Sequence, residues 1–86
     1  MHYEAIRDKL KQQPFDPFDI VLSSGDRYRV RHPDNVLITK RSLVVAVSSP
    51  KQRSDIPESY ASVSYLHVAS LEPALDKKSS KRSNNN

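Results

Sequence analysis

Three arginines stand at alternate positions in one short segment. Arg27, Arg29 and Arg31 would lie on the same face of a β-strand, roughly 7 Å from one to the next. Side chains at such spacing can contact the phosphates of a nucleic-acid strand. Lys40 and Arg41, a short distance along the chain, would extend the basic surface. The segment therefore predicts a candidate nucleic-acid contact.

The same arginines have a second interpretation, the solvated face of an ordinary antiparallel sheet. Asp19 would then be a cross-strand partner that neutralises part of the charge. No aromatic side chains alternate with the arginines on that face to stack on bases. Both interpretations are compatible with the sequence.

The other chemistry-bearing residues do not form a catalytic pattern. His2, His32 and His67 are distant in sequence, and metal binding or general-base catalysis would require two of them to converge with a carboxylate. The single glycine, Gly25, cannot make a phosphate-binding loop, and no serine stands in a Gly-x-Ser-x-Gly context. We therefore expect no enzyme activity, no catalytic or metal site, no cofactor and no small-molecule substrate.

Length and charge narrow the alternatives further. The chain has 86 residues with a formal charge of +4, and residues 76–86 carry +3 of it. This length excludes most metabolic enzyme folds. We expect one domain over residues 1–75, close to neutral, followed by a disordered basic tail over residues 76–86.

No segment of the sequence has the character of a membrane anchor. The longest apolar run, residues 43–47, is far shorter than the roughly 20 residues that a membrane helix needs. The first ten residues contain Glu4 and Asp8, where a secretory signal would be apolar. We therefore expect a cytoplasmic protein without membrane contact.

The elements that would position these residues begin with a helix. Apolar residues at helical spacing predict an amphipathic helix over about residues 3–12. Pro14 ends it, and Pro14 and Pro17 stiffen the connector to the first strand. Phe15 and Phe18 in this connector either plug one end of the core or present an exposed anchor to a partner.

From Phe18 onward the hydrophobic period changes to two, which predicts a β-hairpin. The apolar residues of both strands share a face only if the loop has three residues, 23–25. That register pairs Phe18 with Val30 and sets Asp19 opposite Arg29. It also places Gly25 third in the loop, where a left-handed residue closes the turn.

The remaining patterns predict further strands separated by turns. Strands are expected over residues 36–39, 43–48 and 62–68, with a long loop over residues 49–61. The run at 43–48 is apolar on both faces and predicts the most buried strand. The fold class is mainly β (α+β): a short N-terminal helix and a small, strongly bent antiparallel sheet or barrel of four or five strands over residues 18–73, Sm-like or SH3-like.

Two stretches resemble a family of short uncharacterised bacterial proteins. They are QQPFDPFDIVLSSGDRYRVRHPD and SYLHVASLEP. The pattern typical of the family is Gln-Pro-Phe-x-Pro-Phe, then Ser-x-Gly, then Arg-His-Pro, and near the end Leu-His-x-x-x-Leu-Glu-Pro. The resemblance spans nearly all of residues 3–73 and implies no established activity.

A weaker resemblance is to the Sm-like (Hfq-type) fold, in which a helix precedes a bent five-stranded sheet and RNA binds at the inner rim of a ring. That family's closing Tyr-Lys-His strand would map onto Tyr65, Leu66 and His67, so the resemblance adds His67 to the candidate nucleic-acid contacts. The chain departs from the family at Leu66, which stands in place of a phosphate-contacting lysine.

The sequence favours a non-enzymatic binding or assembly module whose partner is unknown. It would bind a protein or a second copy of itself through a strand edge or an oligomer interface. The alternative is an Sm-like RNA-binding or other nucleic-acid-binding protein that uses the arginine face.

Overall fold

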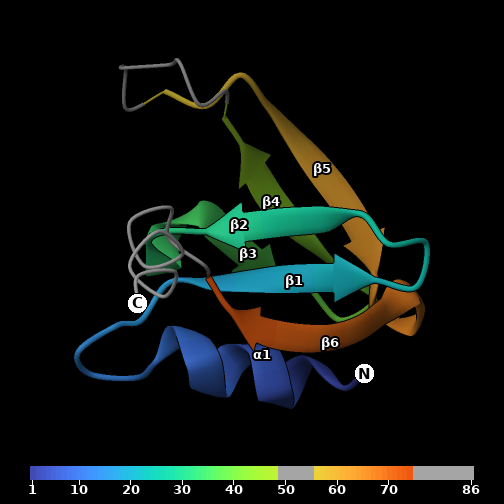
Figure 1. Cartoon of the computed structure of the whole chain (residues 1–86). Coiled ribbons are helices and arrows are strands. Elements are labelled where there is room, and N and C mark those ends of the chain that lie inside the picture. The colour runs from blue at the N-terminus through green and yellow to red at the C-terminus, as the bar shows by residue number, and fades with distance from the viewer. Residues whose placement is uncertain (49–55, 75–86) are drawn as a thin grey trace, which may run out of the picture.

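The structure, a computed structural model, describes residues 1–48 and 56–74 of the chain (Figure 1). The elements follow in the order α1 (Tyr3–Leu10), β1 (Phe18–Leu22), β2 (Arg27–Val30), a 3-10 helix η1 (Pro33–Asn35), β3 (Val36–Ile38), β4 (Ser42–Val47), β5 (Ser59–Ser64), a second 3-10 helix η2 (Tyr65–His67) and β6 (Val68–Pro73). The predicted disordered tail at residues 76–86 lies outside the described residues.

The predicted helix forms and ends slightly early, at Leu10 rather than at about residue 12. Its apolar stripe explains why it docks, because Ile6 is fully buried and Leu10 packs against the core. The connector beyond it includes a cis peptide bond before Pro14. The carbonyl oxygen of Pro17 accepts a hydrogen bond from the backbone N–H of Ala74 (3.2 Å), which ties the connector to the end of β6.

The β1–β2 hairpin has the predicted register. Phe18 pairs with Val30 and Asp19 with Arg29, and the backbone N–H of Leu22 donates to the carbonyl of Asp26. Gly25 has a φ of +98°, a conformation that L side chains rarely adopt. The parity of the apolar residues and the glycine position were therefore sufficient to fix this hairpin.

Six strands form two three-stranded antiparallel sheets among the described residues, with orders β2-β1-β6 and β3-β4-β5. In Figure 1 the first sheet crosses in front of the second, and α1 runs below β6. The prediction of four or five strands in one bent sheet or barrel was correct in class but not in detail, because the described strands do not close a barrel. β1 is the central strand of the first sheet, since β6 pairs along its other side.

The predicted final strand over residues 62–68 is wrong, because the chain turns in its middle. Ser64 caps η2 by accepting a hydrogen bond from the backbone N–H of Leu66 (3.2 Å), and the chain then leaves the second sheet for the first. β5 already begins at Ser59, so the predicted loop over residues 49–61 is too long at its C-terminal end. Residues 49–55 of that loop lie outside the described residues.

The core lies between the two sheets, beside α1. Its largest fully buried side chains come from the helix, from both strands of the first hairpin and from β4: Ile6, Phe18, Ile20, Val30, Leu43 and Val45. Only one face of β4 is fully buried, because Val44 and Ala46 on its other face are half-buried. The hydroxyl of Tyr65 donates to the carbonyl of Thr39 (2.6 Å), which fastens η2 to the end of β3.

Candidate nucleic-acid and strand-binding surfaces

Two of the three predicted arginines hold a buried carboxylate. Asp19, only 3 % exposed, lies between Arg27 and Arg29 on the outer face of the first sheet. The Nε of Arg29 donates to Oδ1 of Asp19 (2.9 Å), and Nη2 of Arg27 donates to Oδ2 (3.1 Å). The same Nη2 also donates to Glu72 of β6 (3.0 Å). The predicted cross-strand pair of Asp19 with Arg29 is therefore present, and Arg27 is a second arginine on the same carboxylate.

The electrostatics of this cluster follow from those contacts. The hydrogen bond from Arg29 is the largest influence on the pKa of Asp19, and together with Arg27 it lowers that pKa below its ordinary value although burial opposes the change. The hydrogen bonds to Glu72 and Asp19 in turn raise the pKa of Arg27. The cluster holds Asp19 ionised at neutral pH and ties β2, β1 and β6 together.

Arg31 is placed differently. Its side chain is exposed and has no ion-pair partner among the described residues. It lines a groove of about 240 Å³ between β2 and the far end of β4, whose lining residues are Arg27, Tyr28, Arg29, Arg31, Asn35, Ala46, Val47 and Ser48. The groove therefore brings the three arginines together, and no carboxylate of residues 1–48 or 56–74 pairs with Arg31.

The other candidate cations lie elsewhere. Lys40 and Arg41 are exposed in the turn between β3 and β4 and do not line the arginine groove. His67 is exposed at the end of η2. His32 caps η1, where its Nδ1 accepts a hydrogen bond from the backbone N–H of Asp34 (3.1 Å). The structure thus separates the predicted contacts into three places.

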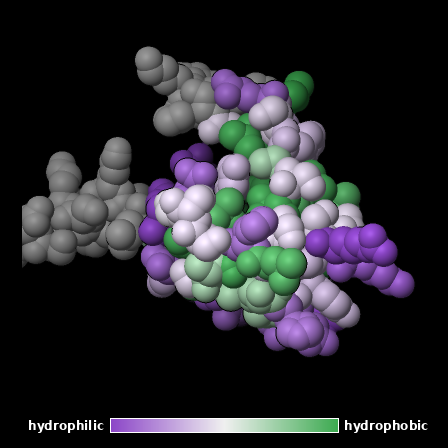
Figure 2. Space-filling view, turned by 90° about the vertical axis from the view of Figure 1, so that its right-hand side faces the viewer, coloured by the Kyte–Doolittle hydropathy of each residue, from purple (hydrophilic) through white to green (hydrophobic). Residues whose placement is uncertain are grey.

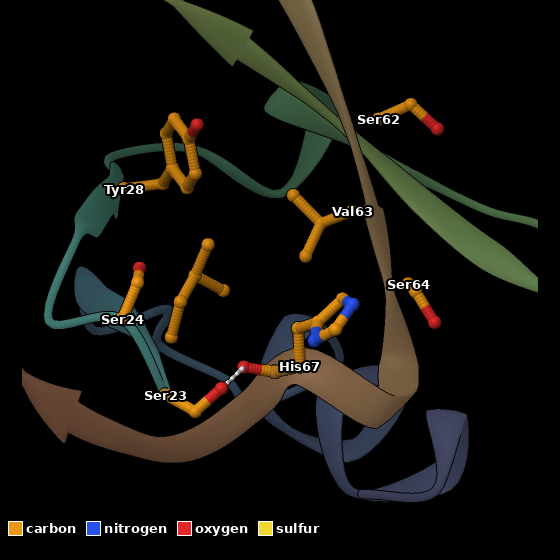
Figure 3. A pocket seen from close by; sticks show the side chains of 8 residues that line it. Ser23, Ser24, Tyr28, Ser62, Val63, Ser64 and His67 are labelled. Atoms are coloured by element: carbon orange, nitrogen blue, oxygen red, sulfur yellow. Dashed lines mark hydrogen bonds between the residues drawn. The ribbon is translucent and has the colours of Figure 1, made fainter.

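His67 borders a crevice of about 290 Å³ between the β1–β2 hairpin and β5. Figure 3 shows Val63 pointing into this space toward Tyr28, whereas Ser62 and Ser64 leave β5 on the opposite side. The backbone N–H of Ser23 donates to the carbonyl of His67 (2.8 Å) and closes one end. The lining residues that come from the second sheet all belong to β5. We name this space the β5 crevice.

β5 is an edge strand with unusual composition. It pairs with β4 on one side, and no other described strand pairs with it. Its six residues, SYASVS, include no charge and no proline. In natural proteins, a charged residue or a proline on an edge strand usually prevents it from pairing with another chain. The absence is visible in the sequence as a charge-free run, but the loop predicted over residues 49–61 covers the first half of the strand.

Several large apolar side chains are exposed on the same molecule. The most exposed are Leu66 (87 %), Ile56 (71 %), Tyr60 (67 %) and Leu37 (64 %). Figure 2 shows hydrophobic side chains gathered near the centre of the face that lies to the right in Figure 1.

Other site chemistry is limited within residues 1–48 and 56–74. These residues contain no group of three or more histidine, aspartate or glutamate side chains that could hold a metal ion. No helix among them has the length and hydrophobicity that a membrane crossing requires.

When the chain is compared with known proteins, no protein-family model matches it, and neither a curated protein nor a solved structure shows significant similarity to it.

Proposed function

We propose that the chain is a non-enzymatic binding or assembly module that accepts an extended strand along the free edge of β5. The observation that carries the proposal is the six-residue, charge-free edge of β5 beside an open crevice. An added strand would satisfy the backbone groups of that edge, which gives affinity, and place alternate side chains in the crevice, which gives specificity.

The other strand edges of the described structure are less suited to this role. β2 carries Arg27 and Arg29, which are engaged with Asp19. β6 contains Glu72 and ends at Pro73, and β3 has only three residues. Charge, proline and shortness each disfavour pairing with another strand. β5 has none of these features.

The crevice favours an apolar side chain on the incoming strand. Its walls include Leu22, Val63 and Tyr28, with the hydroxyls of Ser23 and Ser24 at the rim. Val63 and Tyr28 face each other across it (Figure 3). An apolar side chain placed between them would cover surface that now faces water, which stabilises the complex by about 25 cal/mol per Å² buried.

Ser62→Lys tests this proposal. Ser62 is exposed and faces away from the core, so the substitution should leave the fold intact while adding a charge to the edge. We expect at least a tenfold loss of affinity for any strand-donating partner or second copy, measured by titration and by light scattering after size-exclusion chromatography. In the wild-type complex, the backbone amides of Ser59–Ser64 should gain protection from hydrogen exchange.

Ala69→Lys is the matched control, because it places the same charge at an exposed position on an edge strand of the other sheet. It should bind as the wild type does. Equal losses in both variants, or no gain of amide protection in β5, would contradict the proposal.

The fold that we propose for this module is Sm-like or SH3-like. A helix that precedes a hairpin closed by Gly25, and the late segment Tyr65–His67, support it.

Nucleic-acid binding is the second candidate function, and the groove that gathers Arg27, Arg29 and Arg31 favours it. Arg31 would be the main phosphate contact, since Asp19 and Glu72 already compensate the other two arginines. Leu66 weakens this candidate, because an apolar side chain that is 87 % exposed stands where the Sm-like pattern has a lysine.

Arg31→Glu tests this candidate more cleanly than Arg29→Glu, which would also disturb Asp19. If the groove binds single-stranded RNA, filter binding across a salt series should show that Arg31→Glu binds more weakly than the wild type. The slope of log affinity against log salt concentration should also decrease by about one, the value for one lost phosphate contact. Lys11→Glu, an equal charge change at the exposed end of α1, is the control. Absence of affinity at low salt, or equal effects of both variants, would exclude the groove as the site.

A further inference from the structure

The crossings between the two sheets that the structure describes are both made by a short 3-10 helix. The chain passes from β2 of the first sheet to β3 of the second through η1, and it returns from β5 to β6 through η2. In each helix a capping side chain accepts a hydrogen bond from the backbone N–H two residues later. Oγ of Ser64 accepts from Leu66 (3.2 Å), and Nδ1 of His32 accepts from Asp34 (3.1 Å). The two caps share their connectivity but differ in chemistry.

The difference is that a histidine cap depends on protonation. A hydroxyl oxygen accepts a hydrogen bond at any pH, whereas an imidazole nitrogen accepts one only while it carries no proton. The hydrogen bond from the Asp34 N–H therefore requires a neutral His32 ring with its proton on Nε2. Histidine is the side chain that ordinarily changes its charge between about pH 5 and 8. The side chain of His32 is 63 % exposed, so protons reach it from water.

The same ring nitrogen also faces a carboxylate. Oδ2 of Asp34 lies 3.6 Å from Nδ1 of His32, and this contact is an ion pair only when the ring is protonated. The two contacts act in opposite directions, because the backbone N–H of Asp34 favours the neutral ring and its carboxylate favours the protonated ring. A proton on Nδ1 therefore removes one bond to Asp34 and creates another.

The neighbouring elements supply no second acidic partner for this ring among the described residues. Asp16, in the connector before β1, is the carboxylate that the hairpin register would bring opposite His32 if it continued two residues past its last pair, and no ion pair joins them. Arg31 precedes His32 in the chain and carries a positive charge. The residues of the second sheet that share a hollow with η1 include no carboxylate and no basic group: Leu37, Val44 and Tyr60.

We propose that η1 has a proton-operated cap: protonation of His32 exchanges the hydrogen bond from the Asp34 backbone for an ion pair with the Asp34 side chain. The rest of the capping box survives, because the backbone N–H of His32 donates to Oδ1 of Asn35 (3.1 Å) whatever the charge of the ring. Acid therefore loosens the first turn of η1 and leaves Asn35 in place. The device lies at the crossing from β2 to β3 and does not involve the edge of β5, so it can fail separately from strand addition.

NMR on the full chain tests the inference. At about pH 8 the ring nitrogens of His32 should show the proton on Nε2 and none on Nδ1. As the pH falls from about 8 to about 5, the protection factor of the Asp34 amide against water exchange should fall about fivefold, the effect of losing a typical helix cap. The protection factor already corrects for the intrinsic pH dependence of amide exchange.

His32→Asn is the main test variant, because an amide oxygen caps a helix at any pH. In this variant the Asp34 amide should stay protected over the whole pH range. His67→Gln is the matched control at the histidine of η2, and the fall at Asp34 should be the same as in the wild type. The Leu66 amide of that control should show no change, since Ser64 caps it.

Asp34→Asn tests the part played by the carboxylate. The backbone amide of residue 34 remains, but no carboxylate attracts a proton to the ring, so the cap should be released at a lower pH than in the wild type.

Four results would overturn the inference. The first is a proton on Nδ1 of His32 at about pH 8, and the second is an Asp34 amide whose protection does not change with acid. The third is the same fall in His32→Asn as in the wild type. The fourth is release of the cap at an unchanged or higher pH in Asp34→Asn.

Discussion

Phe18→Ala is expected to lower the free energy of unfolding by about 3–5 kcal/mol. Phe18 is 1 % exposed and belongs to the central strand of the first sheet, where its ring meets Phe15 and lies under the ammonium group of Lys9. Removing the ring leaves a cavity among Ile6, Ile20 and other core side chains that cannot all move inward. Urea denaturation followed by circular dichroism measures the loss.

Phe15→Ala is the matched control, because it removes the same side chain from the preceding Pro-Phe-Asp repeat. Phe15 is half-buried and packs against the core from outside. We expect this variant to lose less than half as much stability as Phe18→Ala. Equal losses would mean that Phe15 is as much a part of the core as Phe18, contrary to the burial that the structure shows.

Asp19→Asn is expected to lower the free energy of unfolding by about 1–3 kcal/mol at pH 7, because hydrogen bonds to an ionised group are the stronger kind. The side chain of Asp19 is 4 % exposed, so its charge is satisfied by Arg27 and Arg29 rather than by water. The arginine side chains remain 42 % and 35 % exposed and can rehydrate, which keeps the loss below that of a fully buried pair.

The same cluster predicts a pH dependence with a definite sign. The arginines lower the pKa of Asp19 in the folded state from its ordinary 3.8. The stabilisation is therefore complete above pH 3.8 and is lost as the pH falls from 3.8 through the lower folded-state pKa. Denaturation across this range should show the stability difference between the wild type and Asp19→Asn shrinking as acid is added.

Glu72→Gln serves as the control for the Asp19 predictions. It removes the charge at the exposed end of the cluster, where Glu72 is 46 % exposed in its pair with Arg27. Solvent screens such a pair, so we expect only a small change in stability at pH 7. A loss as large as that of Asp19→Asn, or a difference between wild type and Asp19→Asn that does not change with acid, would contradict this account.

The first hairpin was predictable in register because two local signals agreed. The apolar residues of both strands share a face only if the residue numbers of each cross-strand pair add up to an even number, as in Phe18 with Val30. Gly25 stands where the loop needs a left-handed residue. Its cross-strand pair, Asp19 with Arg29, followed from the register alone. Glu72 was not predictable, because it reaches Arg27 from β6, whose place beside β1 no local pattern encodes.

The turn at η2 was missed because its residues alternate like a strand. Tyr65 and His67 continue the period-two pattern of β5, yet Ser64 caps a 3-10 turn and the hydroxyl of Tyr65 reaches Thr39. That hydrogen bond joins residues far apart in sequence, so the local pattern could not show it. The β5 crevice could not be predicted for the same reason, since it exists only where β5, η2 and the first hairpin meet.

The central position of β1 has a consequence for the order of events during synthesis. A ribosome finishes β1 and β2 long before Val68–Pro73, the strand that pairs with the other side of β1. At ordinary translation rates this interval lasts roughly 3–10 s, whereas a hairpin closes in about 1–10 μs. Until Val68–Pro73 is made, β1 can pair on one side only, so the first sheet is completed last, by the strand made last.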